Sequence, residues 1–97
     1  MPTYVMLLKW TEQGIKNAKD ALSRQEQGRA GIERAGGRLI GSWWTQGAYD
    51  AVVVVEVPDD ETMSALAITL GRVGDVHTQT MRAYGSEEMQ RILDKVR

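Results

Sequence analysis

Two segments of the chain carry apolar residues on both alternating sets of positions. In residues 3–10 (TYVMLLKW) and 50–57 (DAVVVVEV), neighbouring positions are almost all hydrophobic, so both faces of each strand need burial. Residues 38–46 (RLIGSWWTQ) are also expected to form a strand, with Gly41 as a possible bulge. Residues 75–84 (DVHTQTMRAY) mix polar and apolar positions, which is typical of an edge strand. The pattern predicts four strands, with the first and third in the centre of the sheet.

The segment between the first two strands has the spacing of a helix. Thr11 is a favourable N-cap for a helix over 12–35, and glycines at 36 and 37 end it. One continuous helix would be about 36 Å long, whereas an eight-residue strand spans only about 26 Å. A capping box, Ser23 to Glu26, provides a second start signal. We therefore expect two helical pieces with a break near 19–23. The inner face of the second piece should consist of small residues and one isoleucine that allow close approach, namely Gly28, Gly31, Ile32 and Ala35.

Two further helices are expected later in the chain. Pro58 ends the third strand, and residues 59–70 combine an acidic first turn with an apolar stripe, so a helix closed by Gly71 follows. Residues 86–95 form the last helix, with a stripe of Met89, Ile92, Leu93 and Val96.

The order of these elements predicts an α+β fold. The predicted order is strand, helix, strand, strand, helix, strand. With right-handed crossovers, this order gives a ferredoxin-like βαββαβ domain with an antiparallel sheet in the order 4-1-3-2 and a C-terminal helix. Residues 1–97 fit a single domain. Two helices cover only one face of such a sheet, yet alternate valines of 52–55 make the other face equally apolar. A second copy packed sheet against sheet, a homodimer or a higher homo-oligomer, would cover it.

Composition limits the partners and chemistry. The chain has no Cys, which excludes disulfides and thiolate catalysis. Its net charge of -1 gives no footprint for nucleic acid, and a loose group of arginines at 24, 29, 34 and 38 indicates a solvated helix face. No segment approaches a membrane span, and the N-terminus lacks the basic region of a signal peptide. We expect a cytoplasmic protein with no membrane or nucleic-acid partner.

The predicted topology gathers the aromatic and titratable residues at one end of the sheet. Trp10 ends the first strand beside the beginnings of the third and fourth strands, at Asp50 and His77. The end of the second strand and the following turn reach the same rim. Aromatic rims with a few polar groups are usual ligand sites. The candidate ligand-binding residues are Trp10, Trp43, Trp44 and Tyr49, and the catalytic candidates are His77, Asp50 and Tyr49.

Each of these residues also has a purely structural interpretation. His77 could be a base or metal ligand, but a lone histidine on an edge strand is usually solvated and has no second ligand nearby in sequence. Trp43 and Trp44 point to opposite faces, and packing is favoured over ligand stacking as their role. Asp50 could be an acid or base, or could bind turn amides. The glycines match no phosphate-binding motif and no Ser-His-Asp set can be assembled, so no cofactor or metal is expected.

Three segments resemble the GYD-domain family, together covering roughly residues 3–94. They are YVMLLKWTEQGIKNAKD, WWTQGAYDAVVVVEVPDDE and VHTQTMRAYG. The strand ending Trp10-Thr11-Glu12-Gln13-Gly14 and the hairpin with Tyr49-Asp50 carry the likeness, although Ala48 separates Gly47 from that pair. The resemblance implies membership of the dimeric α/β-barrel group and sheet-to-sheet dimers, and it implies no established reaction.

Three functions remain open from the sequence. The first is a small-molecule binding or sensing domain without catalysis, which the aromatic rim favours. The second is a cofactor-independent enzyme, similar to a monooxygenase or isomerase, acting on an aromatic or haem-like substrate. The third is a structural or assembly protein, for which the polar fourth strand could supply subunit contacts.

Overall fold

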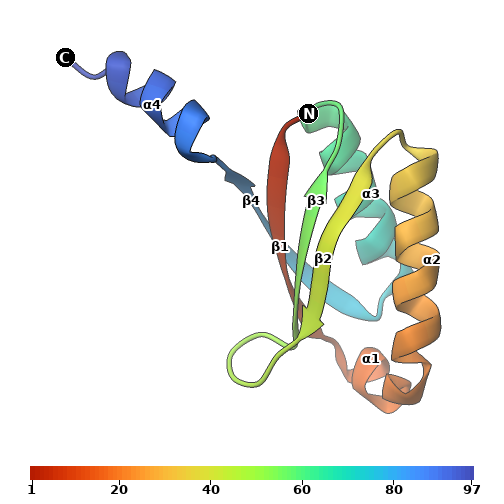
Figure 1. The fold of residues 1–97 in the computed structure, drawn as a ribbon. Helices are drawn as coiled ribbons and strands as arrows, with labels where there is room; N and C mark the ends of the chain where they lie inside the picture. Colours follow the sequence, from red (N-terminus) through yellow and green to blue (C-terminus); the bar gives the residue numbers. More distant parts are fainter.

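The computed structural model describes residues 1–97 and contains one antiparallel sheet with helices on one face (Figure 1). The strand order is β2-β3-β1-β4, which confirms the predicted topology. The strands are β1 (Thr3–Trp10), β2 (Arg38–Trp44), β3 (Ala51–Glu56) and β4 (Val76–Ala83). The two strands with apolar residues on both faces, β1 and β3, are central as expected.

Register assigns each side chain to a face. Val5 pairs with Val54 of β3 and with Met81 of β4, so these three residues share the face away from the helices. We call this the open face. The pairing of β2 with β3 shifts between Leu39 and Gly41, which confirms an irregularity at the predicted bulge.

The first helical segment is broken, and the break comes earlier than the sequence indicates. Helix α1 (Glu12–Lys16) is followed by a short 3-10 turn, η1 (Ala18–Asp20), and by α2 (Ala21–Arg34). Thr11 caps α1 as predicted, since its Oγ1 accepts from the amide of Gly14 at 3.0 Å. The capping box at Ser23 does not start a helix; Ser23 lies inside α2, because the η1 turn has already set the helical direction.

The two later helices are close to their expected bounds. Helix α3 (Asp60–Val73) begins at a cap in which the Asp59 carboxylate accepts from the amide of Thr62 at 2.8 Å. It continues past Gly71 and ends at Gly74, whose φ of 90° is the left-handed conformation that glycine adopts without strain. Helix α4 (Ser86–Asp94) follows β4.

The core lies between the sheet and α3. Its buried members come from β1, β3, the residue after β3, and one position of α3; they are Tyr4, Met6, Val55, Val57 and Met63. Helix α2 contributes no fully buried residue, although Ile32 packs against the edge of this cluster. The sheet is therefore closely covered by one helix and loosely covered by the other.

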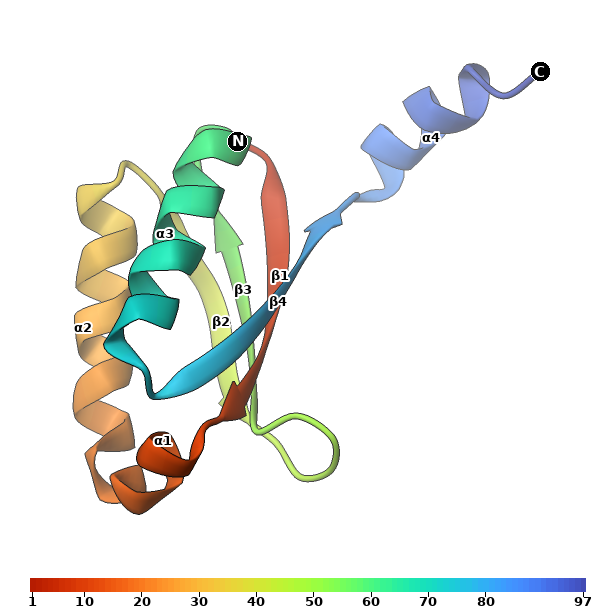
Figure 2. The ribbon, with the colours of Figure 1, turned by 180° about the vertical axis from the view of Figure 1, so that it is seen from behind.

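The open face has no cover within the chain. Figures 1 and 2 show α2 and α3 on the same side of the sheet, with α4 and the loop 45–50 projecting on the opposite side. None of the helices combines the length and apolar character required to cross a bilayer.

Candidate functional site

A cavity of about 370 Å³ separates α2 from the helix-covered face of the sheet. Its floor includes Leu8 of β1 and Val53 of β3, and α3 contributes Leu66 and Leu70 to its wall. Sixteen of its 27 lining residues are hydrophobic. The volume and the lining are within the range of sites for small, mostly apolar ligands.

The composition of α2 explains why this space is not filled. Its inner face follows the helical repeat through Ala21, Arg24, Gly28 and Ile32, all of which line the cavity. A Cβ atom built on Gly28 meets no heavy atom within 4 Å. The sequence predicts that small residues here bring the helix close to the sheet. Instead α2 remains at a distance, and the missing side chains leave a cavity.

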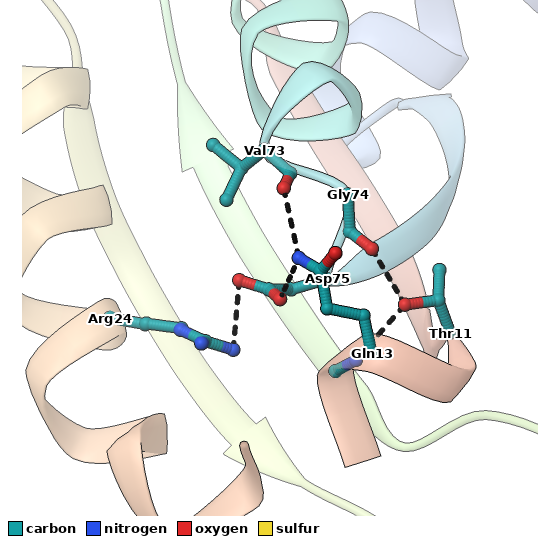
Figure 3. Close-up of polar contacts among 7 residues, drawn as sticks. Thr11, Gln13, Arg24, Val73, Gly74 and Asp75 are labelled. Atoms are coloured by element: carbon teal, nitrogen blue, oxygen red, sulfur yellow. Dashed lines mark hydrogen bonds and ion pairs between the residues drawn. The ribbon is translucent and has the colours of Figure 1, made fainter. Parts of the chain in front are cut away.

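An ion pair at one end of the cavity connects α2 to the sheet (Figure 3). Asp75, which is only 5% exposed, lies 2.9 Å from a guanidinium nitrogen of Arg24. Its other carboxylate oxygen accepts from the Gln13 side-chain amide at 2.8 Å. The interpretation of Arg24 as part of a solvated helix face is therefore wrong, because a buried carboxylate at the start of β4 holds its side chain inward.

The segment before Asp75 also fixes the start of α1. The Thr11 hydroxyl donates to the carbonyl of Gly74 at 2.6 Å, and the Thr11 amide donates to the carbonyl of Asp75 at 3.0 Å (Figure 3). A Cβ on the buried Gly14 would lie 1.9 Å from that Asp75 carbonyl oxygen, so only glycine fits there. The ion pair therefore stands on a rigid junction between β1, α1 and β4.

A second carboxylate lies at the same end of the cavity. One oxygen of Asp50 accepts from the backbone amide of Trp10 at 2.8 Å, across the β1–β3 boundary. The Asp50 amide donates to the carbonyl of Leu8 at 2.8 Å. Asp50 thus binds a strand amide, which is close to its structural interpretation although the partner is not in its own turn.

The structure divides the rim residues between the two faces of the sheet. Trp10, Trp44 and Asp50 line the cavity. Trp43 packs over Gly41, which shares the open face with Val54, and His77 pairs with Lys9 on that face. The Tyr49 hydroxyl donates to the Gln79 side-chain oxygen at 2.5 Å, so Tyr49 joins the open-face group. All six residues lie near one end of the sheet, but they do not surround one site.

Three residues that define the cavity are not identified from the sequence. Gly28 is expected there to pack closely, Arg24 to lie in solvent, and Asp75 only to begin a strand. The sequence offers one signal for this arrangement. An acidic residue, Asp75, directly follows the glycine that ends a helix, and an arginine, Arg24, lies on a helix face that otherwise consists of small residues.

A separate polar cluster occupies the other end of the sheet. The Tyr4 hydroxyl donates to the Asp60 carboxylate, and this bond, together with burial, raises the pKa of Tyr4 to about 12. The guanidinium of Arg82 lies 5.8 Å from the centre of the Tyr4 ring and 4.8 Å from that of Tyr84. Arg82 also pairs with Glu88 at 2.6 Å, and this hydrogen bond lowers the pKa of Glu88.

Most of the charged groups that line the cavity are engaged in structural bonds, whereas Arg34, which also lines it, forms no ion pair within the chain. Arg24 and Asp75 neutralise each other, and Asp50 holds a backbone amide. The chain contains no cluster of three or more His, Cys, Asp or Glu residues arranged to hold a metal ion. The cavity can therefore enclose an apolar body and offer hydrogen bonds to its polar end.

Comparison with known proteins identifies two similarities. The GYD domain family model matches residues 4–93. A relative from Thermus thermophilus, named glutamine synthetase and cystathionine beta-lyase binding protein, is 31% identical over 84 residues. The aligned region covers 86% of this chain and 88% of that relative.

Proposed function

We propose that this chain, which belongs to the GYD domain family, is a binding domain that encloses a small, largely apolar molecule beneath α2. The single observation that supports this most is the cavity itself. A partly open space of about 370 Å³ with mostly hydrophobic walls departs from the close packing of protein interiors, and an apolar ligand that filled it would bury those walls. The proposal keeps the expectation of a cytoplasmic, single-domain protein.

The polar end of the cavity would orient the ligand. Trp10 and Trp44 offer aromatic surface, while Asp50 and the Arg24–Asp75 pair offer hydrogen-bonding groups beside them. An aromatic molecule with one hydroxyl or carbonyl group matches this arrangement better than a highly charged one, because most of the lining is hydrophobic and Arg24 and Asp75 neutralise each other. Binding, rather than turnover, is favoured because Asp75 and Asp50, the carboxylates beside the aromatic surface, already hold structural partners.

Pairing of two copies through the open face is the second part of the proposal. Val5, Val54 and Met81 form an apolar centre on that face, and Trp43, at 56% exposure, extends it. Covering such an exposed apolar surface lowers the free energy of the chain in water. Because both copies would present the same apolar face, a two-fold pair is the simplest arrangement.

The name of the Thermus relative supports a second candidate function. That protein is named for binding two enzymes. If this chain also binds another protein, the open face and α4 are the apolar surfaces available for it. A protein-binding role and a small-molecule cavity are compatible, since a ligand under α2 would stabilise the folded domain that presents those surfaces.

Calorimetric titration with 2-naphthol tests the proposed ligand site. This probe is a flat apolar molecule with one hydroxyl group. We expect one saturable binding event for each chain, and we expect Gly28→Leu, which fills the space under α2, to abolish it. Binding that survives unchanged in Gly28→Leu would place the probe elsewhere, and no binding up to the solubility limit would contradict an aromatic-ligand site.

A further inference from the structure

Helix α4 carries an apolar stripe that its own chain leaves exposed. Met89, Ile92 and Leu93 follow the i, i+3, i+4 spacing of one helix face, and Val96, two residues past the end of α4, continues this spacing in the sequence. Met89 is 43% exposed, Leu93 51% and Val96 69%. The opposite face is charged and polar, so α4 has the character of a helix that packs against something.

The direction of α4 is fixed by side-chain bonds at its base. Arg82, on β4, pairs with Glu88 in the first turn of α4 at 2.6 Å. The same guanidinium stacks on Tyr84, which lies between the strand and the helix. One residue on the strand therefore holds the first turn of the helix, and α4 extends as a defined arm rather than as a loose tail.

The arm projects on the side of the open face. Both views show the sheet with α2 and α3 on one side, and with α4 extending away from them on the other (Figures 1 and 2). A second copy packed on the open face would occupy the space beside which α4 extends.

The size of the open face indicates that the sheet alone is a small interface. Four strands of six to eight residues give the sheet a flat footprint of at most about 26 by 19 Å, or about 500 Å², and the accessible surface of its side chains is somewhat larger than this footprint. Stable interfaces bury about 800 Å² on each partner. Helix α4 extends on the same side, and its exposed stripe adds apolar area to that of the sheet face.

We infer that α4 of each copy packs its apolar stripe on the second copy and closes the edge of the sheet-to-sheet interface. This inference rests on the proposed pairing through the open face and extends it to a specific contact. The occupant is a second copy, because helix α4 and the uncovered sheet face extend on one side of the molecule, both present exposed apolar side chains, and together they approach the area that a stable pair needs. A different protein bound by α4 is the competing outcome.

Sedimentation equilibrium of the full chain and two propensity-matched variants tests the contact. The stripe variant combines Met89→Ser with Leu93→Ser, and the control combines Gln90→Ser with Arg91→Ser on the polar face. Serine costs the helix a similar amount in both. We expect the stripe variant to raise the dimer dissociation constant at least about tenfold, because each dimer loses four buried apolar side chains. The control should change it less than about twofold.

A cross-linking measurement identifies the occupant directly. The chain has no cysteine, so Val96→Cys can carry a single benzophenone label. Irradiation of the purified protein should give a covalent product of two chains. Absence of that product while the wild type sediments as a dimer would overturn the role of α4 and leave the sheet pairing intact.

Failure of the α4 contact can therefore be distinguished from failure of the proposed pairing through the open face. A dimer that the stripe variant leaves unchanged refutes the α4 contact alone. A wild type that remains monomeric at high micromolar concentration refutes both the α4 contact and the proposed pairing.

Discussion

Filling the cavity at Gly28 should stabilise the protein and abolish ligand binding together. Gly28 of α2 lines the cavity and is itself exposed, and a Cβ there meets no heavy atom within 4 Å. Gly28→Leu first removes a glycine from a helix interior, which contributes about 1 kcal/mol to the free energy of unfolding. The leucine side chain then enters apolar space without displacing packed atoms, and we assign about 1 kcal/mol more to its burial.

The combined effect is large enough for thermal unfolding to measure. A gain of about 2 kcal/mol raises Tm by about 8–16 °C in a domain of this size. Gly28→Ala is the matched control, since it keeps the helix-propensity gain of about 1 kcal/mol but leaves most of the cavity open. We expect Gly28→Ala to retain 2-naphthol binding and Gly28→Leu to lose it.

The comparison of Gly28→Leu with Gly28→Ala, in stability and in probe binding, tests the account of the cavity. If Gly28→Leu is less stable than Gly28→Ala, the space under α2 is not available to a side chain. The account of the cavity would then be wrong. If Gly28→Leu is more stable but still binds the probe with wild-type affinity, the cavity exists and the ligand lies somewhere else.

Three further changes test other parts of the account. Gly14→Ala should destabilise the chain by about 3 kcal/mol in urea unfolding, since its Cβ would overlap a carbonyl oxygen at 1.9 Å; an unchanged midpoint would contradict that close approach. The pKa of Tyr4, raised to about 12 by its bond to Asp60, means that the folded chain holds this proton more tightly than the unfolded chain. The stability it contributes should therefore be present below pH 10.0 and lost between pH 10.0 and about 12, and Tyr4→Phe should reduce that loss in unfolding curves measured across this range. Val54→Asp places a charge in the centre of the open face and should convert a dimer to monomer in sedimentation, whereas Ser64→Asp on the outer face of α3 should not; equal behaviour of the two variants would exclude the open face as the interface.

The fold is predictable because its strongest signals are local and agree with the topology. The unbroken valines of β3 and the apolar run of β1 require central strands, and the order of elements then leaves few arrangements. The errors are at helix ends. Gly71 resembles a stop signal but lies inside α3, and only the left-handed φ of Gly74 shows where the helix ends. Ser23 and Glu26 form a signal for the start of a helix, but α2 already begins before them, directly after the η1 turn.

The site is harder to predict because it depends on which face of the sheet each side chain occupies. The alternation of side chains along a strand correctly places Trp43 and Trp44 on opposite faces of the sheet. The sequence nevertheless suggests that the candidate residues at this end of the sheet form one site. The cavity arises from a distance between α2 and the sheet, and a glycine-rich helix face predicts either close approach or an open space. The Arg24–Asp75 bond, which connects α2 to the start of β4, joins residues 51 positions apart in the sequence, so no local pattern reveals it.

The most direct test of the central claim is an NMR titration of the nitrogen-15-labelled chain with 2-naphthol. Amide signals of residues around the cavity, such as Gly28, Ile32 and Val53, should shift together and saturate. Those of the open face, such as Val54 and Met81, should move little. Saturable shifts confined to the open face, or no saturable shift at any cavity residue up to the solubility limit of the probe, would contradict the proposal that the cavity beneath α2 is the ligand site.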